Sequence, residues 1–256
     1  MGDEEDRREV RKCLEAAGLR VEDIPEDSVA GSKRCDVFAR DASERYLVEV
    51  KGFHDDEMIK GKLHNAEVYE RDSSDTYRGN VTKEIRDAIK QLGSTALHYD
   101  DAIWLVALVA RSKHDADVMS EQIMGTLYGV AAITDRGPDG VARRRHCLYF
   151  SESAFHRHPD LDGAIVLDAQ GVGLYLNDYG RRVNRVRESG LARFLAQHSA
   201  SYDMAELESR ADCLVADFDM DRANREAVLD RLKQKYAGRN LSYMDWHRWE
   251  AIGRWP

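Results

Sequence analysis

An uninterrupted run of eight apolar residues, Ile103-Trp104-Leu105-Val106-Ala107-Leu108-Val109-Ala110, constrains the fold of this chain most strongly. Successive side chains of a strand point to opposite faces, so a half-exposed strand alternates apolar and polar residues. This run is apolar at both sets of positions, which is typical of a central strand covered on two sides. The sequence therefore predicts an α/β (α+β) fold with a mixed central sheet and flanking helices.

Shorter patterns place the other elements around this strand. Val81, Ile85 and Leu92 follow helical spacing and predict a helix over 81–98, and a charged amphipathic helix is expected over 4–17. Further strands are expected near 19–24, 130–134, 142–150, 164–168 and 173–177, and further helices near 115–129, 191–198, 204–213 and 222–236. The strands after residue 130 are expected to enlarge the central sheet. We expect a domain over 1–190, with a helical C-terminal part over 191–256 packed on it.

A second informative pattern is the hairpin over residues 33–52, in which two short apolar strands flank the polar turn Asp41-Ala42-Ser43-Glu44. On its second strand, Glu49 and Lys51 point to one face and the valines between and before them to the other. Charges on a half-buried face are costly unless they are paired or bound to metal. Asp36 begins the neighbouring strand and can reach the same edge. Two carboxylates beside one ammonium predict a site for one or two Mg²⁺ ions.

Asp36, followed across a hairpin by Glu49-x-Lys51, resembles the PD-(D/E)xK nuclease superfamily, with Cys35 in the place of the motif's proline. The resemblance covers about the first 110 residues, where the expected order of helix, three strands, helix and strand is that of the superfamily core. It implies a restriction-endonuclease-like core and a metal-dependent nuclease that hydrolyses phosphodiester bonds, with DNA as the favoured substrate.

The resemblance also implies roles for particular residues. The implied catalytic set is Asp36, Glu49, Lys51, Gln91 and Glu9. Mg²⁺ or Mn²⁺ would be held by Asp36, Glu49 and the backbone carbonyl of Val50. Lys51 would orient the attacking water or stabilise the developing charge. Lys90 is an alternative to Gln91 on the second helix, and Glu5 is an alternative to Glu9 on the first.

Basic residues concentrate after the core and are candidates for contact with a nucleic-acid backbone. They are Arg143, Arg144, Arg145, Arg181, Arg182 and Arg185. Arginine suits bidentate contact with phosphate. The alternative interpretation is ordinary surface charge paired with nearby acids. The formal net charge of −9 argues against a protein that coats polyanions generally, although a nuclease needs only a local basic face.

Composition gives broader expectations. No apolar run reaches the roughly 18 residues needed to span a bilayer, and the acidic N-terminus has no secretory signal. The four cysteines are scattered without CxxC pairing, which favours reduced thiols and a cytoplasmic protein. We expect a homodimer, because paired sites match the two-fold symmetry of duplex DNA, with the aromatic C-terminus around Trp246 and Trp249 as a contact surface. The polar loop over 53–80 either covers the metal site or is a solvated insertion.

A non-catalytic module on the same fold, binding nucleic acid or assembling with a partner, is the alternative to the nuclease. In that case Asp36, Glu49 and Lys51 would form a structural cluster of ion pairs. A direct pair between Lys51 and either carboxylate favours the module. A cation shared by the two carboxylates favours the enzyme.

Overall fold

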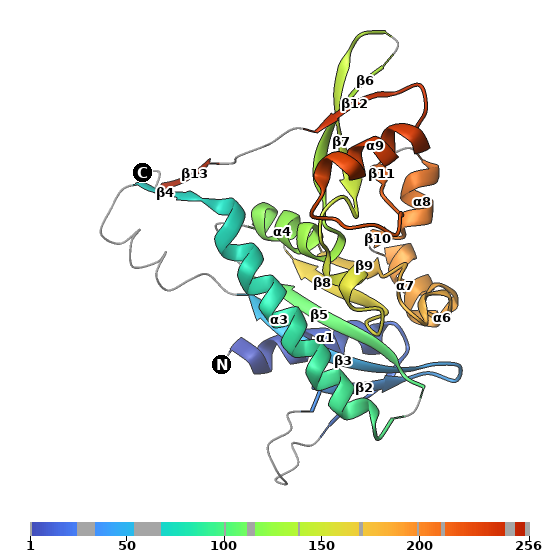
Figure 1. The fold of residues 1–256 in the computed structure, drawn as a ribbon. Helices are drawn as coiled ribbons and strands as arrows, with labels where there is room; N and C mark the ends of the chain where they lie inside the picture. Colours follow the sequence, from blue (N-terminus) through green and yellow to red (C-terminus); the bar gives the residue numbers. More distant parts are fainter. Residues whose placement is uncertain are drawn as a thin grey trace.

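The structure is a computed structural model that describes residues 2–24, 34–53, 68–99, 101–111, 116–137, 139–168, 171–198, 200–210, 213–243 and 249–253. Its described strands form a seven-stranded sheet, a four-stranded sheet and a two-stranded ribbon (Figure 1). No helix among these residues is long and apolar enough to cross a membrane.

The seven-stranded sheet is mixed. Its strands, in spatial order, are β1 (Arg20–Asp23), β2 (Val37–Arg40), β3 (Arg45–Phe53), β5 (Ile103–Ala110), β8 (Gly163–Asp168), β9 (Gly171–Leu176) and β10 (Ala200–Tyr202). The central strands β3, β5 and β8 are parallel, whereas β1, β2 and β3 pair antiparallel, as do β8 and β9. The mixed α/β class with flanking helices is thus confirmed.

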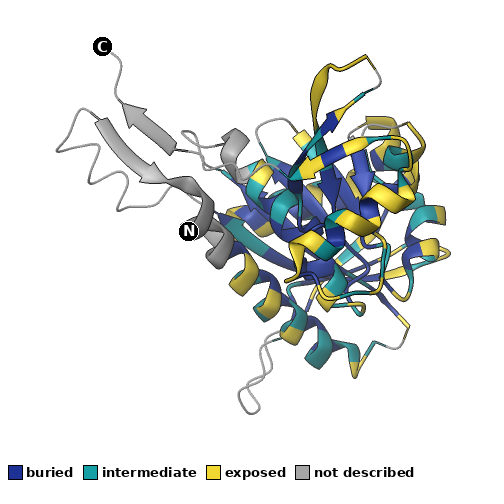
Figure 2. Cartoon of the chain, turned by 45° about the horizontal axis from the view of Figure 1, so that its top comes forward, coloured by how far each residue is buried: buried dark blue, intermediate teal, exposed yellow. Residues whose placement is uncertain are grey.

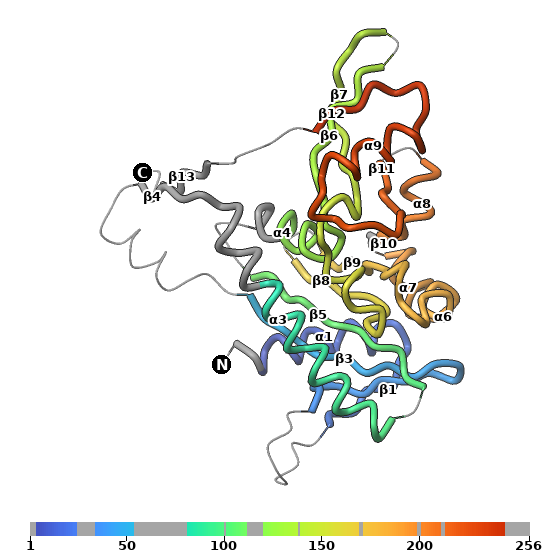
Figure 3. The backbone as a smooth tube through the Cα atoms, viewed as in Figure 1, coloured from blue at the N-terminus to red at the C-terminus, as the bar shows by residue number. Residues whose placement is uncertain are grey.

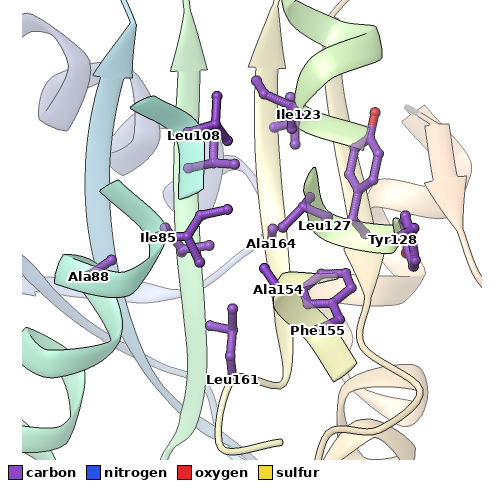
Figure 4. Close-up of a cluster of buried hydrophobic side chains, with 14 of the residues drawn as sticks. Ile85, Ala88, Leu108, Ile123, Leu127, Tyr128, Ala154, Phe155, Leu161 and Ala164 are labelled. Atoms are coloured by element: carbon purple, nitrogen blue, oxygen red, sulfur yellow. The ribbon is translucent and has the colours of Figure 1, made fainter. Parts of the chain in front are cut away.

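Helices cover both faces of this sheet. One face carries α3 (Ser73–Ala96), α4 (Ala116–Tyr128) and α5 (Ala154–Arg157), and the other carries α1 (Gly2–Ala16), α6 (Val183–Glu188) and α7 (Gly190–His198). The apolar run in β5 serves both layers, since Val106 and Leu108 belong to the first core and Leu105 and Ala107 to the second. Figure 4 shows Leu108 packed against Ile85 of α3 and the helices beside it. The prediction of a central strand covered on two sides is confirmed.

The four-stranded sheet differs from the sequence-based expectation. Its strands, in spatial order, are β11 (Cys213–Val215), β7 (Ala142–Leu148), β6 (Ala131–Arg136) and β12 (Asn240–Tyr243). The strands near 130–150 therefore leave the central sheet, which grows through β8, β9 and β10 instead. Figure 3 shows the C-terminal β12 beside β6, although about a hundred residues separate them in sequence. The core of this unit joins Ile133 and Leu241 to Val228 and Leu232 of α9 (Arg225–Lys235).

The expectation that the C-terminal part is helical was wrong, because this part also contains strands. Besides α7, α8 (Met204–Ser209) and α9, the part after residue 190 contains β10, β11, β12 and β13 (Trp249–Gly253). These strands have three to five residues, too few for an alternating pattern to stand out. The domain boundary at residue 190 stays a prediction.

The segment before α3 ends in a strand. β4 (Val68–Asp72) pairs antiparallel with β13, and α3 begins directly after it, earlier than expected. Residues 54–67 of the polar loop expected over 53–80 lie outside the described residues, as does Trp246. Figure 2 shows that buried residues concentrate in the two sheets and in the inner faces of the helices.

Candidate metal centre

Asp36 and Glu49 lie close together at the open end of the hairpin. The register of β2 and β3 ends with Val37 against Val48, so Asp36 and Glu49 are the next residues beyond the last pair. The Asp36 carboxylate is near enough to Glu49 to raise its pKa. The two carboxylates are therefore brought together as expected, although Asp36 lies just before β2 and not within it. Glu49 and Lys51 share one face of β3 with Leu47, under helix α3.

Hydrogen bonds to α3 fix the backbone just before Asp36. The Cys35 backbone N–H donates to Thr95 Oγ1 at 2.8 Å, and Gln91 Nε2 donates to the Arg34 carbonyl at 3.3 Å. With the backbone of residues 34–35 drawn to the helix, Asp36 Oδ2 takes the Val50 N–H at 2.9 Å. The N–H and C=O of one strand residue point to the same side. The Val50 carbonyl therefore faces the same side as Asp36, as the resemblance implied for a metal ligand.

Glu49 is a buried acid with one direct cationic partner among the described residues. Its side chain is 2% exposed, its Oε1 contacts Lys51 Nζ at 2.8 Å, and its Oε2 accepts no hydrogen bond from the described residues. Burial, and then the nearby Asp36 carboxylate, raise the pKa of Glu49 to about 8, against the opposing effect of Lys51. Two neighbouring carboxylates need a shared proton or a cation between them.

Lys51 is held between a strand and a helix. Its Nζ donates to Gln91 Oε1 at 2.9 Å and lies 4.0 Å from Glu84 Oε2, in addition to its contact with Glu49. The structure therefore brings Gln91, a residue that the resemblance implied, into contact with Lys51. Lys90, the alternative, points outward and pairs with Asp87 at 3.0 Å. Glu84 was missed, although it lies seven residues before Gln91 and so on the same helical face.

Arg7 was not anticipated either. Its guanidinium contacts Asp36 Oδ1 at 2.8 Å, and its side chain is 49% exposed, whereas that of Asp36 is 8% exposed. Helix α1 packs by Val10 and Leu14 on the opposite face of the sheet, so Arg7 reaches Asp36 at the sheet edge. The first helix is charged throughout, and nothing in its pattern distinguishes this arginine.

Glu9 does not join the site. It contacts Arg111 at 3.0 Å, as do Glu5 at 2.8 Å and the buried Asp6 at 2.7 Å. Arg111 follows β5 directly, and the helix face that meets it is not the face that supplies Arg7. The implied role of Glu9 in the catalytic set, and of Glu5 as its alternative, is thus not supported by the geometry.

The six arginines predicted to contact phosphate are mostly committed to acids of the protein itself. The pairs are Arg143 with Asp139, Arg145 with Asp135, Arg181 with Asp160, Arg182 with Asp162, and Arg185 with Glu44 and Asp101. Asp162 is fully buried and also accepts the backbone N–H groups of Trp104 and Arg182. These contacts favour the ion-pair interpretation for the residues that form them.

The donor set at the hairpin fits a hard divalent cation. Two carboxylates and a carbonyl are the oxygen ligands that Mg²⁺ and Mn²⁺ prefer. The Glu49 oxygen without a hydrogen-bond donor and the raised pKa of that group are the features that a bound cation would relieve. The chain matches no family model, no curated protein and no solved structure. What the site does must therefore be inferred from its own geometry.

A first test addresses the anchor of Asp36. We expect Thr95→Val to lower the free energy of unfolding by about 1–3 kcal/mol, because the Cys35 N–H loses its acceptor in a buried setting. Urea denaturation measures this loss. Ser94→Ala is the matched control, since both hydroxyls donate to the Gln91 carbonyl but only Thr95 also accepts from Cys35. Equal losses in the two variants would contradict an anchoring role.

A second test uses the pKa of Glu49. In the folded state Glu49 keeps its proton up to about pH 8, whereas in the unfolded chain it has the ordinary pKa of 4.5. The stability that comes from this retained proton is complete below pH 4.5 and is lost as the pH rises through 8. In EDTA, we expect wild type to lose stability relative to Glu49→Gln over this window, by a few kcal/mol in order of magnitude. Denaturation at pH 4.5, 6 and 8 checks it, and a pH-independent difference would contradict it.

Proposed function

We propose that the protein is a metal-dependent nuclease of the PD-(D/E)xK type that hydrolyses phosphodiester bonds, with DNA as the favoured substrate. The observation that carries this proposal is the buried Glu49 carboxylate next to that of Asp36, with Lys51 in contact. The element order from α1 through β1, β2, β3 and α3 to β5 supports the same proposal, because it is the order implied by the resemblance.

The chain's own residues divide the chemistry between them. Asp36, Glu49 and the Val50 carbonyl would hold Mg²⁺ or Mn²⁺, which lowers the pKa of a bound water and neutralises phosphate charge. Lys51 supplies a positive charge and three donors beside the carboxylates, where they can stabilise charge that develops on the phosphate. Gln91 fixes the Lys51 ammonium by accepting from it, so Gln91 acts as a positioning residue. Arg7, half exposed at Asp36, is placed to contact a phosphate at the rim.

The alternative function is a non-catalytic module that binds nucleic acid or a protein partner. The direct 2.8 Å contact between Lys51 and Glu49 is the arrangement that this alternative predicts. Two features weigh against it. One ammonium leaves the second Glu49 oxygen without a donor, and a purely structural cluster gains little from an acid whose pKa is raised to about 8.

The deciding experiment is a cleavage assay on plasmid, linear duplex and single-stranded substrates with Mg²⁺, Mn²⁺ or EDTA. The nuclease predicts cleavage with either metal and none in EDTA. Binding of nucleic acid without cleavage under every condition would favour the module.

A further inference from the structure

Each carboxylate of the candidate metal centre has a cationic partner from the protein itself. Lys51 Nζ lies 2.8 Å from Glu49 Oε1, and a guanidinium nitrogen of Arg7 lies 2.8 Å from Asp36 Oδ1. The other oxygen of Asp36 accepts the Val50 N–H at 2.9 Å. Only the second oxygen of Glu49 has no donor among the described residues. A divalent cation that binds both acids would therefore compete with these cationic side chains.

The two cationic partners differ in how firmly they are held. The Lys51 side chain is 17% exposed, it projects from β3, and its ammonium also donates to Gln91 Oε1 at 2.9 Å. Arg7 lies on α1 with 49% of its side chain exposed, and Asp36 is its one ion-pair partner in the part of the chain that the structure describes. Rotation of side-chain torsions is enough to carry the Arg7 guanidinium into solvent, whereas Lys51 would also have to leave Gln91. Arg7 is therefore the partner that a cation can displace.

A divalent cation would take over the part that Arg7 plays at Asp36. Mg²⁺ or Mn²⁺ would use the same carboxylate oxygens and bring twice the charge of the guanidinium. The Asp36 side chain is 8% exposed, and at such a site water screens charges poorly, so two cations on one carboxylate repel each other. A guanidinium released at the rim still carries five donors in a planar fork, the geometry that suits phosphate oxygens.

We propose that Arg7 is an internal substitute for the metal ion: it holds Asp36 in the metal-free protein and is displaced when a divalent cation binds the two carboxylates. The inference rests on the proposed function for its metal, and it adds the regulation of that site. Without metal, Arg7 keeps Asp36 occupied and is itself withheld from phosphate. With metal, the guanidinium is free at the rim, so the site gains its phosphate contact only when the cation is present.

The test titrates the metal-free protein with Mn²⁺ alone, without nucleic acid, by isothermal titration calorimetry. Arg7→Ala should bind Mn²⁺ roughly three- to tenfold more tightly than wild type, because the cation no longer has to break a half-exposed ion pair. Arg8→Ala is the matched control. It removes the same charge from the next residue of α1, where the side chain is 63% exposed and lies 3.9 Å from Glu4. Its affinity for Mn²⁺ should equal that of wild type.

Thermal unfolding gives a second readout that does not depend on activity. In EDTA, Arg7→Ala should be less stable than wild type, because the buried Asp36 carboxylate loses its cationic partner. At saturating Mn²⁺ this difference should disappear, because the loaded wild-type protein no longer contains the pair of Arg7 and Asp36. A ligand that binds the variant more tightly also stabilises it more, by mass action.

Three outcomes would overturn the inference and leave the proposed function intact: equal Mn²⁺ affinity in wild type and Arg7→Ala, an equal gain in Arg8→Ala, or a stability difference that persists at saturating Mn²⁺. A wild-type protein that binds no Mn²⁺ would end both the metal-dependent nuclease and the inference. If the variants behave as expected but no substrate is cleaved with Mg²⁺ or Mn²⁺, the proposed function fails and the displacement of Arg7 stands.

Discussion

Glu49→Gln is expected to reduce metal-dependent cleavage by roughly 10³-fold or more, because the substitution removes one of two charges that would hold the cation. Glutamine keeps the shape of the side chain and can still accept from Lys51, so the fold should survive. In EDTA at pH 8 the variant should even be more stable than wild type, since it removes a buried acid whose charged form is disfavoured. A loss of activity together with a gain of stability is the signature of a functional carboxylate.

The matched control is Glu84→Gln, which changes the same chemical group next to the same lysine but at 4.0 Å. Activity of this variant should stay within a few-fold of wild type. Asp36→Asn should resemble Glu49→Gln, and the double variant should be no worse than either one, because residues that form one metal site act as a unit. Full activity of Glu49→Gln, measured as the initial rate of plasmid nicking with Mg²⁺, would place the chemistry elsewhere.

Lys51→Ala is expected to lower kcat by roughly 10²-fold, the usual effect of losing one electrostatic donor in the transition state. Duplex affinity should change little, because the Lys51 side chain is only 17% exposed and its ammonium already contacts Glu49 and Gln91. Single-turnover kinetics and anisotropy on the same substrate separate the two effects.

Two variants sharpen this prediction. Lys90→Ala removes a lysine of α3 that points outward, and it should leave kcat unchanged. Gln91→Ala removes the acceptor that orients Lys51, so it should lower kcat by less than Lys51→Ala does. The double variant should lose little more kcat than Lys51→Ala alone. An unchanged kcat in Lys51→Ala would support the non-catalytic binding module.

Local geometry was most predictable where the periodicity of the sequence fixed it. The alternation along β3 placed Glu49 and Lys51 on one face, and the hairpin brought Asp36 close to Glu49. Gln91 was a candidate because the resemblance implied a polar residue on this helix, and it contacts Lys51.

Contacts between distant segments were less predictable. Arg7 reaches Asp36, and Glu9 instead reaches Arg111, because of how α1 is rotated on the sheet, which its charged sequence does not define. The four-stranded sheet joins β6 and β7 to three- and four-residue strands from the C-terminal part. Arg185 looked like part of a free basic surface because its acid partner Glu44 lies far away in the sequence. Arg143 pairs instead with Asp139, four residues before it.

The anchoring of both sides of the site on α3 has a mechanical consequence. Gln91 fixes the ammonium of Lys51, while Thr95, one turn later, holds the backbone that leads into Asp36. An α-helix is stiff over one turn, so these two anchors move as one body. A tilt of α3 would therefore pull at once on the cationic group and on the backbone that leads into Asp36. Both are also tied to β3, since Lys51 is a residue of that strand and Asp36 accepts the Val50 N–H, so α3 and β3 hold the three charged groups of the site together.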